Sequence, residues 1–260
     1  GGSAGYVSLE VSPALAHDAD ATVAAGLRLK AAVGCPNLLI KVPATAAGLV
    51  AIERLVGAGV SVNVTLMFSL AHVDAVAAAY VRGLERLRSA DGEAVAVMSV
   101  ASLFLSRVDT LVDKHLEQLG GDALALRGRS AVATAKLAYQ RYLERFHGPA
   151  FDALRAAGAR PQYMLWASTG TKNPAYSDLL YVEPLIGAET INTLPDATLA
   201  ALRDHGRVAD TLEEDVEQAA QHCVALAAAG IDLLAVGERL QHEGLAQFEQ
   251  AFAQLLQLTA

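Results

Sequence analysis

The chain has 260 residues, of which 53% are hydrophobic, and it carries a formal net charge of −8 with a pI near 5.3. This length and apolar content suffice for a substantial core, so we expect residues 1–260 to form a single domain. The acidic balance, without a basic and aromatic patch, argues against a nucleic-acid-binding surface. Small molecules are therefore the expected partners.

The two cysteines, Cys35 and Cys223, are far apart and show neither disulfide-framework nor zinc-site spacing. The seven histidines form no HxH or HExxH pattern, so no metal site is expected. The cysteine pattern favours a reducing compartment, and we expect a cytoplasmic location. The tract VALAAAGIDLLAV is interrupted by Gly230 and Asp232 and falls short of the roughly 20 apolar residues of a membrane span. The opening GGSAGYVSLE has no features of a signal peptide.

Short β-like runs alternate with longer helical runs along the chain. Strands are expected at 6–11, 37–42, 60–68, 100–104, 162–167 and 189–194. A helix is expected after the first strand and ends near residue 30. Further helices are expected at about 48–56, 69–87 and 106–121, and at 211–230 after the last strand. Ser69 is a natural N-cap for one of these helices, and Thr211 with Glu214 has the spacing of a capping box for another.

Strands separated by ten or more helical residues need crossover connections, so the sheet is expected to be parallel with helices outside it. An α/β barrel and a doubly wound sheet both satisfy this pattern. Because no GxGxxG or GxxxxGKS loop follows any strand, we favour a TIM-type barrel. The six predicted strands are two fewer than a closed barrel has, which predicts an incomplete barrel with two unpaired strand edges.

Barrels of this type place their chemistry at the carboxyl ends of the strands. The polar residues expected in that layer are Glu10, Lys41, Asn63, Thr65, Ser102 and, after the fifth strand, Lys172. Among the five lysines of the chain, Lys30, Lys114 and Lys136 fall in helical stretches, which leaves Lys41 and Lys172.

A lysine buried in a strand without a partner pays a desolvation cost, and its pKa falls until the amine is neutral. A neutral amine is a nucleophile, which suits an enzyme that forms a Schiff base with a ketone. Two plainer interpretations of Lys41 stay open from the sequence. It could extend from the strand end to solvent, or form an ordinary ion pair with Glu10.

Several blocks of the sequence resemble the transaldolase family closely. They are VSLEVSP, LIKVPAT, NVTLMFS, SVASLFLSRVD, AKLAYQ and LWASTGTKNPAYSD, in family order from residue 6 to about 192. The C-terminal helices are also similar. The resemblance implies transfer of a dihydroxyacetone unit from a ketose phosphate, such as fructose 6-phosphate or sedoheptulose 7-phosphate, to an aldose phosphate, a reaction of the pentose phosphate pathway. It implies no metal or organic cofactor, and the sequence is compatible with a homo-oligomer.

By position in these blocks, the resemblance assigns the Schiff base to Lys41 and the catalytic water to Glu10 and Thr65. For Thr65, an ordinary β-branched strand residue is the alternative.

The resemblance also implies a set of substrate-binding residues. Asn63 and Ser102 match positions that hydrogen-bond the dihydroxyacetone hydroxyls, and Phe104 matches an aromatic residue of the site wall. Arg107 and Lys172 match the positions that hold the sugar phosphate, where an arginine fork and a lysine point charge suit phosphate oxygens. A local salt bridge to Asp109 or Asp113 is the alternative for Arg107.

The chain departs from the family pattern at its beginning. In the family, two further strands precede VSLEV and carry an aspartate for acid/base catalysis and an asparagine that binds substrate. We expect the sequence to be a fragment of a longer protein; completion by another chain and a shortened, weakly active protein are the alternatives. Two other functions also stay open: a fructose 6-phosphate aldolase that releases dihydroxyacetone to water, and a sugar-phosphate-binding protein without catalysis.

Overall fold

The computed structural model describes residues 5–90 and 97–259, and its centre is one sheet of six parallel strands. The strands are β1 (Val7–Glu10), β2 (Leu38–Pro43), β3 (Val62–Met67), β4 (Ser99–Phe104), β5 (Tyr163–Ala167) and β6 (Thr190–Asn192). All six predicted strands are present, although β1, β3 and β6 are shorter than predicted. Within the described residues β1 and β6 do not pair with each other, so they form the edges of the sheet.

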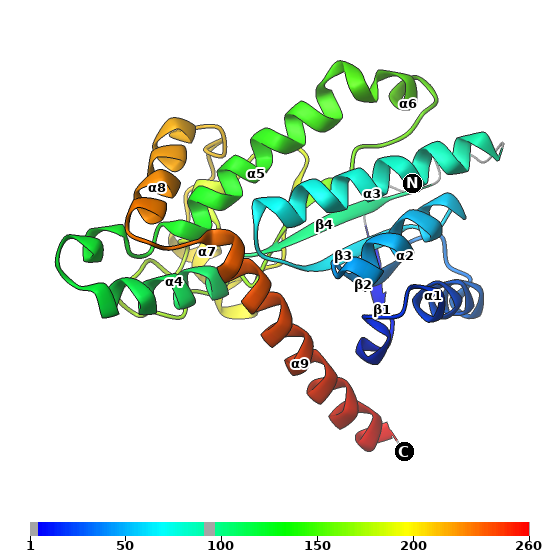
Figure 1. Cartoon of the computed structure of the whole chain (residues 1–260), viewed down its shortest axis with the longest axis horizontal. Coiled ribbons are helices and arrows are strands. Elements are labelled where there is room, and N and C mark those ends of the chain that lie inside the picture. The colour runs from blue at the N-terminus through cyan, green and yellow to red at the C-terminus, as the bar shows by residue number, and fades with distance from the viewer. Residues whose placement is uncertain (1–4, 91–96, 260) are drawn as a thin grey trace.

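Helices connect successive strands, and three further helices follow the last strand within residues 193–259 (Figure 1). The α-helices are α1 (Ala19–Val33), α2 (Ala46–Gly57), α3 (Leu70–Ser89), α4 (Ser106–Leu119), α5 (Ser130–His147), α6 (Asp152–Ala156), α7 (Asp196–His205), α8 (Val216–Ala228) and α9 (Leu233–Thr259). The 3₁₀ helices are η1 (Pro13–Leu15), η3 (Gly121–Leu126), η4 (Pro149–Phe151) and η5 (Glu183–Leu185). Helices α2, α3 and α4 match their predicted ranges within a few residues. The predicted N-cap of α3 is confirmed, because the Ser69 side chain accepts a hydrogen bond from the His72 amide.

The predicted capping box at the start of α8 is wrong. Asp215 has a positive φ of 55°, and the helix therefore begins only at Val216. The Thr211 hydroxyl donates instead to the Glu183 carbonyl oxygen, which ties the segment before α8 to η5. A tertiary contact thus replaces the local one that the spacing predicted.

The strand order distinguishes a barrel-type sheet from a doubly wound one. Neighbouring strands follow chain order from β1 to β6, whereas a doubly wound sheet reverses its order at a switch point. Because parallel crossovers are right-handed, a constant direction of progress puts the connecting helices on one face of the sheet. The predicted TIM-type α/β fold class is confirmed by this arrangement.

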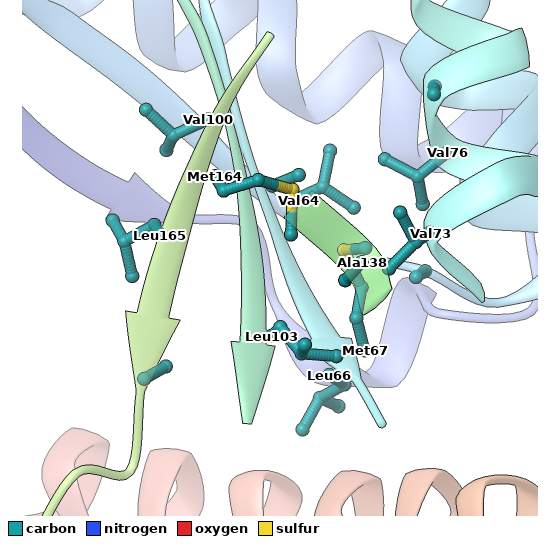
Figure 2. Close-up of a cluster of buried hydrophobic side chains, with 14 of the residues drawn as sticks. Val64, Leu66, Met67, Val73, Val76, Val100, Leu103, Ala138, Met164 and Leu165 are labelled. Atoms are coloured by element: carbon teal, nitrogen blue, oxygen red, sulfur yellow. The ribbon is translucent and has the colours of Figure 1, made fainter. Parts of the chain in front are cut away.

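The two faces of the sheet have different characters. Figure 2 shows Val64 and Met164 on the side that packs against Val73 and Val76 of α3, and all four belong to the buried core. The opposite face carries polar side chains in register, because Lys41 of β2 is aligned with Glu10 on one side and with a residue of β3 on the other. Aligned residues of parallel strands project from the same face. The site therefore belongs to the face away from the helical layer.

The long helix α9 crosses the carboxyl ends of the central strands. The Gln241 amide donates to the carbonyl oxygens of Ala44 and Leu66, each at 3.0 Å, just after β2 and within β3. A β-bulge in β3, where Leu66 has a φ of 60°, accompanies this contact. Gly244 permits the close approach, since a Cβ there would lie 2.9 Å from Leu66 Cδ2. In Figure 1, α9 runs from the region of α4 toward the side of η1 and α1.

None of the helices within 5–90 and 97–259 is both long and apolar enough to cross a membrane by itself. One pair of neighbouring helices in the described part of the chain, α8 and α9, reaches the required length and composition together, and the two are bent by 87°.

Candidate active site

Lys41 and Glu10 form an ion pair at the carboxyl side of the sheet. Lys41 Nζ lies 3.2 Å from Glu10 Oε2, and both side chains are about three-quarters buried, with 25% and 26% exposed. Burial raises the pKa of the Glu10 carboxyl above its ordinary value of 4.5, although the Lys41 charge and hydrogen bond oppose the rise. Of the two plainer interpretations of Lys41, the ion pair with Glu10 is the one that forms. The pair sets a proton acceptor beside a primary amine, so it is also compatible with Schiff-base chemistry.

Asn63 connects three strands beside this pair. Its Nδ2 donates to Ser8 Oγ on β1 at 2.9 Å, and its Oδ1 accepts from Ser102 Oγ on β4 at 2.7 Å. Asn63 and Ser102 are buried, so their mutual hydrogen bond fixes the orientation of both side chains. The structure therefore brings together the two residues predicted to hold the dihydroxyacetone hydroxyls.

Thr65 lies two residues further along β3, on the same face as Asn63. Its side chain is fully buried, and its Oγ1 has no hydrogen-bond partner among the described residues. Buried hydroxyls almost always have a partner, because leaving one unpaired costs about 1–3 kcal/mol. A packing role alone would be served better by valine, which has the same shape and no hydroxyl.

Arg107 lies in the first turn of α4, and its guanidinium lies over the Phe104 ring at 5.7 Å. Its Nη1 donates to Gln247 Oε1 of α9 at 2.8 Å, and burial lowers the pKa of Arg107. The predicted alternative, a salt bridge to Asp109 or Asp113, does not form.

Asp109 and Asp113 instead bind the segments around them. Asp109 accepts from the Tyr181 hydroxyl at 2.9 Å and from a backbone amide at the start of α5 at 2.8 Å. Asp113 accepts from the Tyr176 hydroxyl at 2.7 Å. Burial, the largest influence, raises the pKa of Asp109 to about 6. Asp109 and Asp113 therefore hold the loop after β5 against α4.

Lys172 lies in that loop and is not joined to the other predicted residues. It is exposed and makes no hydrogen bond or ion pair with any described residue. It lines a cavity of about 220 Å³ together with residues of α4, Asp109 and Asp113 among them. Its role in phosphate binding therefore stays a prediction from the sequence.

The residues that α9 adds to the site are not among those predicted from the sequence. The centre of the Phe248 ring lies 4.9 Å from Lys41 Nζ, and the Gln247 side chain accepts a hydrogen bond from Arg107. The signal was available, because Gln241, Gly244 and Phe248 recur at helical spacing and form one face. Nothing in that pattern, however, says that the face lies on the lysine rather than on the helical layer.

Within the part of the chain that the structure describes, no three His, Cys, Asp or Glu side chains are grouped so that they could hold a metal ion. A separate cavity of about 550 Å³ lies between α5 and α8 and includes none of the predicted site residues.

Sequential parallel strands with a lysine and a carboxylate at their carboxyl ends define an α/β-barrel protein whose site lies at the strand ends. The model of the transaldolase/fructose-6-phosphate aldolase family matches residues 2–259. The transaldolase of Thiobacillus denitrificans is 57% identical over 256 residues, which cover 98% of this chain and 71% of that protein. The transaldolase of Mycolicibacterium smegmatis is 48% identical over 257 residues, covering 98% of this chain and 69% of that protein. The chain belongs to the transaldolase/fructose-6-phosphate aldolase family.

Proposed function

We propose that the chain has transaldolase activity and transfers a dihydroxyacetone unit between sugar phosphates through a Schiff base on Lys41. The observation that carries the assignment to this residue is the Lys41–Glu10 contact of 3.2 Å on the polar face of the sheet. The sequence relatives named transaldolase support the reaction. In this reaction sedoheptulose 7-phosphate and glyceraldehyde 3-phosphate give erythrose 4-phosphate and fructose 6-phosphate.

The proposed chemistry uses the amine as both nucleophile and electron sink. The Lys41 amine attacks the C2 carbonyl of the ketose, and loss of water gives an iminium. Removal of the C4 hydroxyl proton then breaks the C3–C4 bond, whose electron pair moves to the iminium as an enamine while an aldose phosphate leaves. The enamine carbon attacks the aldehyde of the acceptor, and water releases the new ketose from Lys41. Glu10, with its raised pKa, and Thr65 would hold the water that carries these protons.

The remaining predicted residues would hold the substrate. Asn63 and Ser102 are fixed side by side and would meet the hydroxyls of the three-carbon unit. Phe104 would form a wall of the site. Arg107 would bind the phosphate, because only one of its N–H donors is bonded within the described residues. Lys172 would add a second charge to the phosphate from the loop after β5.

The second candidate activity is a fructose 6-phosphate aldolase, which the description of the matching family names beside transaldolase. Both activities share the lysine enamine and differ in whether an aldehyde or a proton receives the enamine electrons. Fructose 6-phosphate is incubated with and without erythrose 4-phosphate, and sedoheptulose 7-phosphate and free dihydroxyacetone are measured. We expect product only when the acceptor is present. Equal release of dihydroxyacetone without acceptor would assign the aldolase reaction instead.

The proposal includes sugar phosphates as substrates and no metal or organic cofactor. It also places the activity in the cytoplasm, which two free cysteines support, Cys35 exposed and Cys223 half-buried. Assembly into a homo-oligomer is part of the proposal and is tested by the mass of the protein in solution.

A further inference from the structure

The contacts that hold helix α9 against the carboxyl ends of the strands come from its first half and not from its last turns. Gln241 binds the backbone of β3 and of the segment after β2. Gly237 lies against the α3 N-cap, where a Cβ would come within 2.8 Å of Ser69 Cβ. Substitutions further along α9, beyond Leu245, can therefore change the site without removing the contacts that hold the helix in place.

Two adjacent residues of α9 contact two different parts of the predicted site. The centre of the half-buried Phe248 ring lies 4.9 Å from Lys41 Nζ, and Gln247 accepts a hydrogen bond of 2.8 Å from Arg107. Consecutive residues of a helix project about 100° apart, so one short segment covers the nucleophile and also holds the phosphate-binding group.

We propose that Gln247 and Phe248 form a positioning cap over the site, in which Gln247 orients Arg107 for the substrate phosphate and Phe248 shields the Lys41 nitrogen from water. The inference rests on the proposed function, since it gives these residues roles in the same Schiff-base reaction. It adds a specificity element from a helix that supplies neither the nucleophile nor its acid/base partner.

The Phe248 ring would decide the fate of the enamine. In transfer, the enamine electron pair forms a C–C bond to the acceptor aldehyde. In the competing path the same pair takes a proton, and hydrolysis of the resulting iminium releases dihydroxyacetone and restores the amine. A ring this close to the nitrogen leaves less room for water on that side, which favours the first path.

The Gln247 contact would set the direction of the Arg107 fork. An arginine binds phosphate best when two N–H groups point at two oxygens. The side-chain oxygen of Gln247 holds one end of the guanidinium in place. In Gln247→Ala, we expect the KM for fructose 6-phosphate to rise about 5-fold with kcat within twofold, and inhibition by inorganic phosphate to weaken in parallel. Gln250→Ala, an exposed glutamine three residues further along α9, is the matched control and should change neither value.

For Phe248, the test compares two phenylalanines of one helix. Phe248→Ala should raise the ratio of released dihydroxyacetone to transferred product about tenfold, whereas Phe252→Ala, one turn further along, should leave it unchanged. Phe248→Leu keeps most of the apolar volume and should restore a ratio close to that of the wild type. Thermal unfolding of all variants shows whether α9 remains docked.

The outcomes separate this inference from the proposed function. A wild-type chain that forms no borohydride-trapped adduct with fructose 6-phosphate would contradict both. An adduct and transfer in the wild type, with equal ratios in Phe248→Ala and Phe252→Ala, would contradict the role of Phe248 alone. Equal KM and phosphate inhibition in Gln247→Ala and Gln250→Ala would contradict the role of Gln247.

Discussion

Glu10 Oε2 lies 3.2 Å from Lys41 Nζ, at aligned positions of two neighbouring parallel strands. The contact follows from register, because aligned residues of β1 and β2 project from the same face. It joins an amine to a carboxyl group whose burial raises its pKa.

Glu10→Gln should lower kcat by about 10²- to 10⁴-fold, the usual value of acid/base assistance. Because burial raises the pKa of Glu10, the carboxylate forms only above the ordinary value of 4.5, and the acid limb of the wild-type pH–rate profile should lie above that value. The profile of Glu10→Gln should lose this limb. An unchanged limb in the variant would assign the titration to another group.

The Thr65 hydroxyl, which has no partner among the described residues, predicts opposite effects on stability and on activity. Thr65→Val should raise the free energy of unfolding by about 1 kcal/mol, since it removes a buried hydroxyl without a partner among the described residues. It should also lower kcat, because the hydroxyl would no longer hold the catalytic water. Thr65→Ser keeps the hydroxyl and should retain most of the activity. Urea unfolding and steady-state rates measure both, and full activity in Thr65→Val would mean that Thr65 only packs.

Lys172→Ala tests the phosphate role that the structure leaves unsupported by contacts. We expect KM for fructose 6-phosphate to rise several-fold with little change in kcat, because a charge contact to the phosphate contributes to binding throughout the reaction. Lys30→Ala removes the same charge from an exposed position of α1, outside the cavity that Lys172 lines, and should leave KM unchanged. Similar values of KM for both variants and the wild type would remove Lys172 from the site.

Asp109 predicts a pH dependence of stability. Its pKa is about 6 in the folded protein, against 3.8 for an unperturbed aspartate, so folding raises its affinity for a proton. The protonated Asp109 adds to the free energy of unfolding. This stabilisation is fully present below pH 3.8 and is lost as the pH rises through 6, by up to about 3 kcal/mol. Asp109→Asn should lack this loss, while the exposed Asp122→Asn should keep it. Urea unfolding between pH 4 and 7 measures the difference, and parallel curves for the wild type and Asp109→Asn would contradict it.

The sequence predicted the fold because its signals are local. Alternation of strands and helices and the absence of a phosphate loop were sufficient for a barrel-type parallel sheet, and strand position placed Glu10, Lys41 and Asn63 in one layer. The capping box at Thr211 failed because a contact with Glu183, distant in the sequence, replaced the local one.

The contribution of α9 could not be predicted in the same way. The contacts of Phe248 with Lys41 and of Gln247 with Arg107 join positions 207 and 140 residues apart. Periodicity identifies the face of a helix that is buried, but it does not identify the partner of that face. The β3 bulge at Leu66, which accompanies the docking of α9, leaves no pattern in the sequence either.

The central claim, a Schiff base on Lys41, is tested most directly by borohydride reduction in the presence of fructose 6-phosphate, followed by peptide mass spectrometry. We predict a reduced three-carbon adduct on the peptide that contains Lys41, and none in Lys41→Ala. An adduct on another lysine, or one that persists in Lys41→Ala, would contradict the account.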